Sequence, residues 1–352
     1  MKNVFVYIIF IVIFASLVLT SKAQTESFVV RNVNVVDVAG GKAISNQNVF
    51  IEYGRILKIT RSNDKKLNLK TIDGRGKFLI PGLWDFHFHA LALPNEEKFS
   101  LPVYVANGIT GIRDLGSFKS LVEQRNLAES AEKDEIISPR IILTGAIIDG
   151  PPGAWEGIRV AKTREDGIRE ANKLLHEGWQ YLKTYSLLPL DAYLGVAEVA
   201  KKRNVPLIWH IPDGIKMMDA VNAGHKAVEH IDKVLLGCSS KEEEVVNDRA
   251  KIIESGDLQQ LFVSFRKHKD QMLNSVDWKK CEQLAEAMAK NKMFVSPTMI
   301  VIDFYLGKDP PPDDPRFRYV PEAIKKQWSE ADRRRLGRTQ DDYDFAAKNE
   351  RT

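Results

Sequence analysis

The stretch Leu79-Ile80-Pro81-Gly82-Leu83-Trp84-Asp85-Phe86-His87-Phe88-His89 decides the fold of this chain. It opens with a Pro-Gly turn and continues as an apolar run of strand type. Because side chains alternate along a strand, His87 and His89 project to one side while Phe86 and Phe88 face the other. Two such imidazoles can bind one metal ion, although the pattern also suits two polar residues on the solvated side of a strand.

Downstream of Gly82 the chain repeats an apolar strand, a polar loop and an amphipathic helix, which is typical of βα units with a parallel sheet. Helices are predicted at 165–177 and at 192–202, the second capped by Asp191. A charged segment at 241–269 indicates an inserted helical pair. Seven strands are predicted, at residues 82–87, 111–113, 140–144, 181–184, 206–210, 227–230 and 293–297. This α/β pattern favours a (β/α)8 barrel of TIM type over an open sheet.

A different pattern precedes the barrel. Short β-rich runs at 28–38, 48–52 and 55–60 are separated by turn signals at Gly40-Gly41 and Tyr53-Gly54. They predict a small N-terminal β domain, resembling a β-sandwich, at 24–78, followed by the barrel at 79–352.

The first residues have the pattern of a secretory signal peptide. Lys2 precedes an apolar run from Val4 to Leu19, and Ser21-Lys22-Ala23 resembles a cleavage site. The run is short for a membrane span. We therefore expect cleavage after residue 23, a secreted or periplasmic product, and no stable membrane anchor afterwards.

The charge balance limits the classes of binding partner, and the cysteine content limits the number of disulfides. Lys and Arg number 51 and Asp and Glu number 47, for a formal net charge of +4, which points to no nucleic-acid partner. Only Cys238 and Cys281 are present, so at most one disulfide can form. We expect two free thiols.

Further histidines follow predicted strands. His210 ends Leu207-Ile208-Trp209-His210, and His230 ends Ala227-Val228-Glu229-His230. In a (β/α)8 barrel the carboxyl ends of the strands form the active face, so these side chains converge with His87 and His89 and have the character of metal ligands. His225 is a weaker alternative to His230, and His176 and His268 are interpreted as surface residues.

Lys183 is the next candidate, because it lies in the apolar run Tyr181-Leu182-Lys183-Thr184-Tyr185. A lysine in such a strand must be paired, must lose its charge, or must extend its amine to solvent at the strand end. A desolvated amine loses its proton readily. It can then take up carbon dioxide, and the two oxygens of the resulting carbamate can bridge two divalent ions.

The stretch 79–89, with Asn107-Gly108-Ile109-Thr110-Gly111-Ile112-Arg113-Asp114, resembles the metal-dependent amidohydrolase superfamily, in its secreted imidazolonepropionase-related or prolidase-like branch. The resemblance implies two divalent ions, zinc by preference, bridged by a carboxylated Lys183. It further implies that Tyr185, two residues later, contacts a substrate carbonyl, although packing is an equal alternative. The implied ligands are His87, His89, Lys183, His210 and His230.

The implied reaction is hydrolysis of a C–N bond in a small-molecule amide, cyclic amide or dipeptide-like substrate, by a hydroxide that the metals activate. The family carries a general-base aspartate at the end of strand eight. After Pro297 no apolar run ends in such an aspartate, and Asp303, Asp341 and Asp344 are left unassigned. We therefore expect an incomplete barrel without its eighth strand.

Two alternatives stay open because of that aspartate. The chain could be a truncated, inactive remnant that acts at most as a binding protein, or an esterase or lactonase that uses the same metals. The Pro-rich and basic segment at about 304–340 is predicted to form a lid on the barrel rim. Substrate identity, metal identity and oligomeric state are not determined by the sequence.

Overall fold

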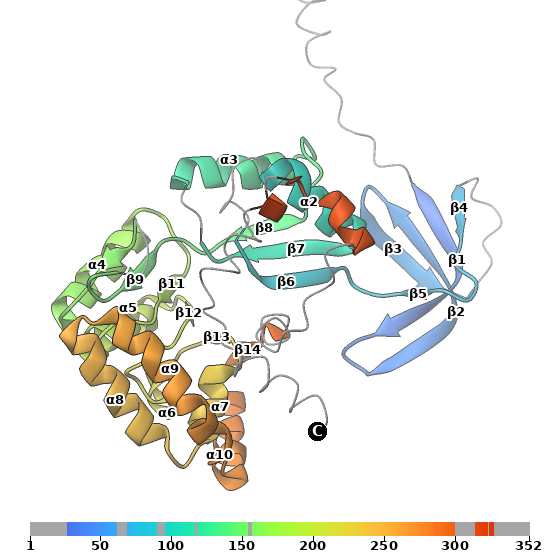
Figure 1. Cartoon of the computed structure of the whole chain (residues 1–352). Helices are drawn as coiled ribbons and strands as arrows, with labels where there is room; N and C mark the ends of the chain where they lie inside the picture. Colours follow the sequence, from blue (N-terminus) through green and yellow to red (C-terminus); the bar gives the residue numbers. More distant parts are fainter. Residues whose placement is uncertain are drawn as a thin grey trace, which may run out of the picture. The chain divides into compact units, whose positions relative to one another are not determined.

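The computed structural model describes residues 27–61, 69–89, 96–116, 119–153, 157–299, 314–322 and 324–326 (Figure 1). The predicted signal peptide and most of the predicted lid lie outside these residues. The chain divides into two compact units after Pro81. Among the described residues, no helix is both long enough and apolar enough to cross a membrane.

The first unit contains a five-stranded sheet with the order β3-β2-β1-β4, in which β5 also pairs with β1. β1, β2 and β3 are antiparallel neighbours, whereas β4 and β5 run parallel to β1. The β2–β3 hairpin turns at Tyr53 and Gly54, which both have positive φ, the geometry that matches the twist of such hairpins. The strands are β1 (Phe28–Asp37), β2 (Lys42–Glu52), β3 (Arg55–Thr60), β4 (Lys70–Asp73) and β5 (Phe78–Leu79).

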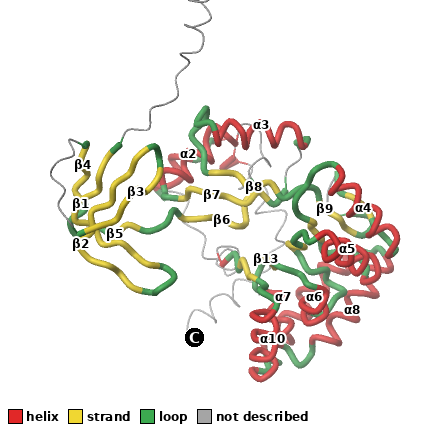
Figure 2. The backbone as a smooth tube through the Cα atoms, turned by 180° about the vertical axis from the view of Figure 1, so that it is seen from behind, coloured by secondary structure: helices red, strands yellow, loops and turns green. Residues whose placement is uncertain are grey.

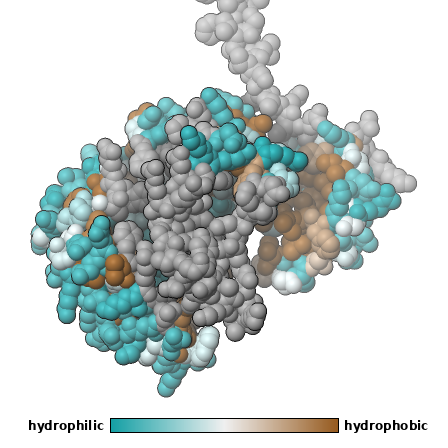
Figure 3. Space-filling view, in the orientation of Figure 1, coloured by the Kyte–Doolittle hydropathy of each residue, from teal (hydrophilic) through white to brown (hydrophobic). Residues whose placement is uncertain are grey.

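The three strands predicted for this unit are confirmed as β1, β2 and β3, with β2 beginning earlier than predicted. A second layer, which the sandwich-like interpretation requires, is not among the described residues of this unit. Val29 and Val49 are fully buried, while Ile56, Ile59 and Ile72 are exposed. Figure 3 shows the resulting apolar surface over the strands.

The second unit contains two sheets of parallel strands. A three-stranded sheet has the order β6-β7-β8, and a six-stranded sheet has the order β10-β9-β11-β12-β13-β14. The strands are β6 (Leu83–Phe88), β7 (Ile109–Asp114), β8 (Arg140–Leu143), β9 (Ile147–Asp149), β10 (Arg159–Val160), β11 (Leu182–Thr184), β12 (Leu207–Trp209), β13 (Ala227–Glu229) and β14 (Phe294–Ser296). All seven predicted strands are confirmed to within two residues, whereas β9 and β10 were not predicted.

A break at Gly145 explains why there are two sheets. β8 pairs with β7, and β9, three residues further on, pairs with β11. Gly145 lies between them with φ of 93°, and a Cβ there would lie 2.7 Å from the Trp179 ring. The chain thus passes from one sheet to the other directly after the third predicted strand. Among the described strands, β14 and β6 do not pair, so a closed barrel is not shown. Figure 2 shows β6, β7 and β8 side by side in one sheet.

Helices follow the strands, as βα units require. They are α2 (Glu96–Ala106), α3 (Leu121–Glu132), α4 (Arg164–His176), α5 (Leu190–Arg203), α6 (Met217–Ala223), α7 (Asp232–Cys238), α8 (Glu242–Ser255), α9 (Leu258–Leu273), α10 (Trp278–Lys290) and a 3-10 helix (Pro315–Tyr319). The inserted helical pair is confirmed as α8 and α9. The predicted cap was wrong, because Asp191 lies inside the first turn of α5 and Pro189 occupies the N-cap without a side-chain bond.

The main core of the second unit lies between the strands of the six-stranded sheet and the helices α4 and α5. Every residue of β11, β12 and β13 is buried, as expected for parallel strands that are covered on both faces. Leu182, Leu207 and Val228 of these strands pack in the same cluster as Val196 of α5. The polar residues at the ends of these strands are therefore attached directly to the buried core.

The expectation of free thiols was wrong. Cys238, the last residue of α7, and Cys281 in α10 are joined by a disulfide, with 4.6 Å between their Cα atoms. The sequence leaves this open because the two residues are 43 positions apart, and only the packing of α7 against α10 brings them together.

Candidate metal centre

His87 and His89 leave the carboxyl end of β6 on one side of the strand. His87 is the fifth residue of β6, and His89 follows the strand directly. Their ring centroids are 5.5 Å apart. The main-chain N–H of His87 donates to the Asp85 carboxylate at 2.9 Å, which fixes the backbone at this point. The pair has the arrangement that strand alternation predicts.

His210 and His230 reach the same place from two other strands. Each directly follows its strand, β12 and β13. The His230 ring lies 4.7 Å from the His87 ring and 4.9 Å from the His210 ring, centroid to centroid. The structure thus brings all four of the candidate histidines into one cluster at the carboxyl ends of parallel strands, where the sequence placed them.

The remaining histidines lie elsewhere. His225, the weaker alternative, is fully buried, and its ring nitrogens contact the Tyr193 hydroxyl at 3.2 Å and the Ala227 carbonyl at 2.9 Å. His176 is exposed, as expected. The prediction for His268 was wrong: its side chain is buried in α9 and contacts the Ser264 hydroxyl at 3.1 Å.

Each of the four clustered histidines uses its Nδ1 for a contact with an oxygen. The Glu229 carboxylate and the Gly116 carbonyl can only accept hydrogen bonds, so in the neutral rings of His87 and His89 the proton lies on Nδ1. The four distances are 3.1 Å from His87 to the Glu229 carboxylate, 3.3 Å from His89 to the Gly116 carbonyl, 3.4 Å from His210 to the Ser186 hydroxyl, and 2.6 Å from His230 to the Thr298 hydroxyl.

Burial disfavours the charged form of three of these imidazoles. It lowers the pKa of His89 to about 4 and holds the pKa of His210 well below its ordinary value, with further lowering by neighbouring histidines. Burial also lowers the pKa of His230, and His87 adds to the effect. A metal ligand must be a neutral imidazole, so the lowered pKa values of His89, His210 and His230 favour the state that coordination needs.

Lys183 lies inside β11 and its side chain is fully buried. Its ammonium donates to the Leu115 carbonyl and lies 4.9 Å from the centroid of the Trp209 ring. Burial lowers the pKa of Lys183 to about 7, an effect that Asp114 partly opposes. A substantial fraction of the amine is therefore neutral at pH 7, which meets the chemical requirement for carbamate formation.

Tyr185 and Trp209 form an aromatic wall beside the cluster. The Tyr185 ring lies 4.4 Å from the His210 ring and 4.8 Å from the Trp209 ring. Trp209 has φ of 88° and His230 has φ of 66°, a backbone region that large side chains avoid. Such strained residues persist where the surroundings hold them, and they gather at functional sites. A molecule bound at His210 would therefore also lie close to the Tyr185 ring.

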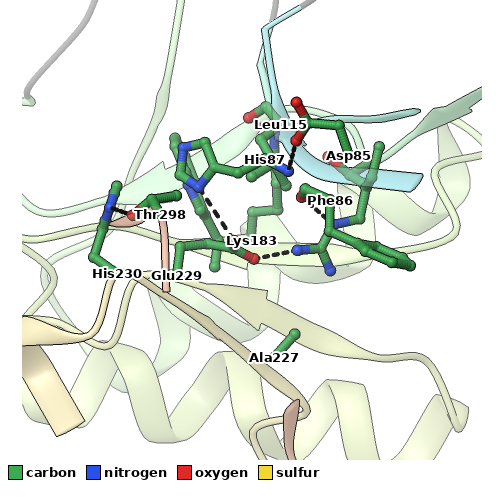
Figure 4. A network of polar contacts seen from close by, with 12 residues as sticks. Asp85, Phe86, His87, Leu115, Lys183, Ala227, Glu229, His230 and Thr298 are labelled. Atoms are coloured by element: carbon green, nitrogen blue, oxygen red, sulfur yellow. Dashed lines mark hydrogen bonds and ion pairs between the residues drawn. The ribbon is translucent and has the colours of Figure 1, made fainter. Parts of the chain in front are cut away.

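Glu229 and Arg113 belong to the site but were not identified from the sequence. The Glu229 side chain is fully buried at the end of β13 and contacts both His87 and the Arg113 guanidinium (Figure 4). The signal was present, because Glu229 is a charged residue in an apolar strand, the same anomaly that singles out Lys183.

Two features of a complete catalytic centre are not seen in the part of the chain that the structure describes. No three histidine, cysteine, aspartate or glutamate side chains there are arranged so that they could hold a metal ion as they stand. Asp303, Asp341 and Asp344, the acids left unassigned, lie outside the described residues.

Comparisons with known proteins identify the fold. No protein-family model matches the chain, and no curated protein matches it either. A solved structure of an uncharacterised protein matches with a TM-score of 0.55 and 20% identity, over 91% of this chain and 76% of that one. A protein described as a prolidase from Bifidobacterium longum matches with a TM-score of 0.50 and 20% identity, over 64% and 58% of the two chains.

A third structure, a prolidase complexed with N-methylphosphonate-L-proline, matches with a TM-score of 0.49 and 19% identity, over 76% of this chain and 77% of that one. The structural neighbours are amidohydrolase-superfamily proteins. At these identities the first two likenesses show that the chain shares their mixed α/β fold with sheets of parallel strands.

Proposed function

We propose that this chain is a metal-dependent amidohydrolase that cleaves C–N bonds in small amide, cyclic amide or dipeptide-like substrates. The observation that carries the proposal is the cluster of four histidines at the carboxyl ends of parallel strands, each with its Nδ1 in contact with an oxygen. The signal-peptide pattern at residues 1–23 supports a secreted or periplasmic location.

The donor set fits two divalent ions, with zinc as the best match, because imidazole nitrogen and carbamate oxygen are ligands that zinc accepts. His87 and His89 would hold the first ion, His210 and His230 the second, and a carboxylated Lys183 would bridge them. When bound, such ions lower the pKa of a water molecule and polarise a carbonyl.

The chain's own residues would perform the remaining tasks. The Tyr185 hydroxyl would orient the substrate carbonyl, because the ring packs against His210. The wall formed by Tyr185 and the buried Trp209 would exclude water from one side of the substrate. The likeness to a prolidase supports a dipeptide-like substrate, and it is the reason for testing Xaa-Pro dipeptides first.

Metal analysis of the purified chain tests the proposal. We expect about two zinc ions per chain by mass spectrometry, because the proposed ligand set serves two ions. His210→Ala should lose at least one of them, and the matched control His176→Ala, on the exposed face of α4, should lose none. Fewer than one ion in the unmodified chain, or full retention by His210→Ala, would overturn the site.

A substrate panel separates the remaining alternatives. The purified chain is assayed with N-acyl amino acids, Xaa-Pro dipeptides, lactones and simple esters. Turnover of the amides at a rate that falls with His210→Ala supports the proposal. Turnover of lactones or esters alone favours the esterase reading. Zinc binding without any turnover favours a binding protein.

A further inference from the structure

The contacts of Glu229 point to a role that the proposed ligand set leaves out. Its side chain is fully buried, and its two oxygens serve different partners. Oε2 lies 3.1 Å from Nδ1 of His87, and Oε1 accepts from the Arg113 guanidinium. A carboxylate accepts hydrogen bonds and donates none, so Nδ1 of His87 must carry the proton and Nε2 the lone pair.

Arg113 holds the carboxylate in place from a second strand. Its Nε donates to the Phe86 carbonyl at 2.8 Å, and its other arm reaches Glu229. The guanidinium therefore links β7 to the backbone beside His87 and to the end of β13 at the same time. The N–H groups of the planar guanidinium point in fixed directions. Arg113 therefore fixes the position of the Glu229 carboxylate as well as balancing its charge.

The geometry points to Glu229 as the positioning residue for His87, with Arg113 as its anchor. We infer that this pair sets the tautomer and ring orientation of His87 and so the affinity of the site for its first metal ion. The inference rests on the proposed metal site. Elsewhere, carboxylates behind a metal-binding histidine change metal affinity by about 10- to 100-fold when they are removed.

Zinc affinity is the first test, measured by competition with a chromophoric chelator. Glu229→Gln keeps the shape but loses the charge and a full acceptor, so we expect affinity for the first zinc to fall by about 10- to 100-fold. Glu242→Gln is the matched control. Glu242 is equally buried and accepts from the Met217 amide at 2.8 Å and from the Lys280 ammonium at 2.6 Å, so its loss perturbs a buried ion pair away from the histidines.

A double-mutant cycle separates positioning from general stability. If Glu229 acts through His87, then Glu229→Gln should have no further effect on zinc affinity in a His87→Ala background. It should still weaken binding in a His210→Ala background. Equal effects in both backgrounds would overturn the inference and leave a structural role for Glu229.

The tautomer of His87 gives a readout that needs no metal. In the metal-free chain, ¹⁵N-resolved NMR of the imidazoles should show His87 protonated on Nδ1, and Glu229→Gln should shift the population toward the other tautomer. An unmodified chain that binds no zinc overturns the proposed function, whereas an Nε2-protonated His87 overturns the positioning role. If Glu229→Gln does not fold, Arg113→Lys, which keeps the charge but loses the fork, should give the same changes at smaller size.

Discussion

Two regions of the second unit each bury a lysine, and they differ in the groups that surround its amine. Lys183 is the middle residue of β11 beside the histidine cluster, and its amine contacts a carbonyl and an aromatic ring. Lys233 lies in the first turn of α7, and its amine donates to the carbonyls of Pro212 and Asp213. Burial lowers the pKa of Lys183 to about 7 and that of Lys233 to about 8.

The surroundings of Lys233 are those of a buried charge cluster. Asp213 lies 3.5 Å from the Arg249 guanidinium, which stacks over the Phe265 ring at 4.3 Å. Burial raises the pKa of Asp213, while Lys233 and Arg249 oppose the rise. Two cations and one carboxylate here tie the loop after β12 to α7 and α8.

The comparison teaches that a lowered lysine pKa does not by itself identify a reactive amine. Desolvation is the largest cause in both regions. What distinguishes Lys183 is its neighbourhood, because the imidazoles around it are themselves candidate metal ligands. Lys233 has two carbonyl acceptors, and the charge of the Asp213 carboxylate partly opposes the lowering of its pKa, which is a structural arrangement.

The largest expected effect separates the two lysines by metal content. Lys183→Met should reduce bound zinc to one ion or fewer and lower turnover by about a thousandfold, because the proposed bridge between the ions is lost. Lys233→Met, the matched control, should retain both ions. Metal analysis and steady-state kinetics of the two variants measure this, and two zinc ions in Lys183→Met would contradict the assignment.

The next effect concerns the charge cluster. Asp213→Asn leaves Arg249 and Lys233 buried without their carboxylate, so we expect the free energy of unfolding to fall by about 3 kcal/mol. Urea denaturation measures the change. Zinc content of the folded variant should stay the same. A loss below about 1 kcal/mol would show that the cluster is solvated in solution.

The smallest effect is a difference in pH dependence. A lysine whose pKa is lower in the folded than in the unfolded state costs stability in full below its folded pKa, and the cost disappears as pH rises toward 10.5. With chelator present, the unmodified chain should therefore gain stability relative to Lys183→Met from about pH 7 upward, by up to roughly 1.4 kcal/mol per pH unit.

The corresponding gain relative to Lys233→Met should begin only near pH 8. Urea midpoints measured at pH 6, 7, 8 and 9 give both curves. Curves that rise together would show that the two amines have the same environment.

Local patterns predicted the elements of the fold well. The seven strands, the hairpin at Tyr53 and Gly54 and the helical pair α8 and α9 all depend on periodicity and turn residues within a short window. β9 and β10 were missed because they are three and two residues long and are held by their neighbours in the sheet. The cap of α5 was predicted at Asp191, but the helix begins earlier, with Pro189 at the N-cap.

In the candidate site, too, some residues could be predicted from local patterns and others could not. His87, His89, His210 and His230 were identifiable because each stands at the end of a strand that the sequence reveals. The partners of these histidines were not identifiable, since Glu229 is 142 residues from His87 and Thr298 is 68 residues from His230. The burial of His268 and the disulfide of Cys238 likewise depend on how helices pack.

The sequence alone determined which side chains stand at the carboxyl ends of the strands, because strand direction and alternation are written in the local pattern of apolar residues. Only the tertiary structure decided which oxygen each histidine Nδ1 contacts, how deeply Lys183 is buried, and that Arg113 and Glu229 contact each other beside His87. These properties arise from contacts between residues far apart in the chain, and they are set by the curvature of the sheets and the packing of helices around them.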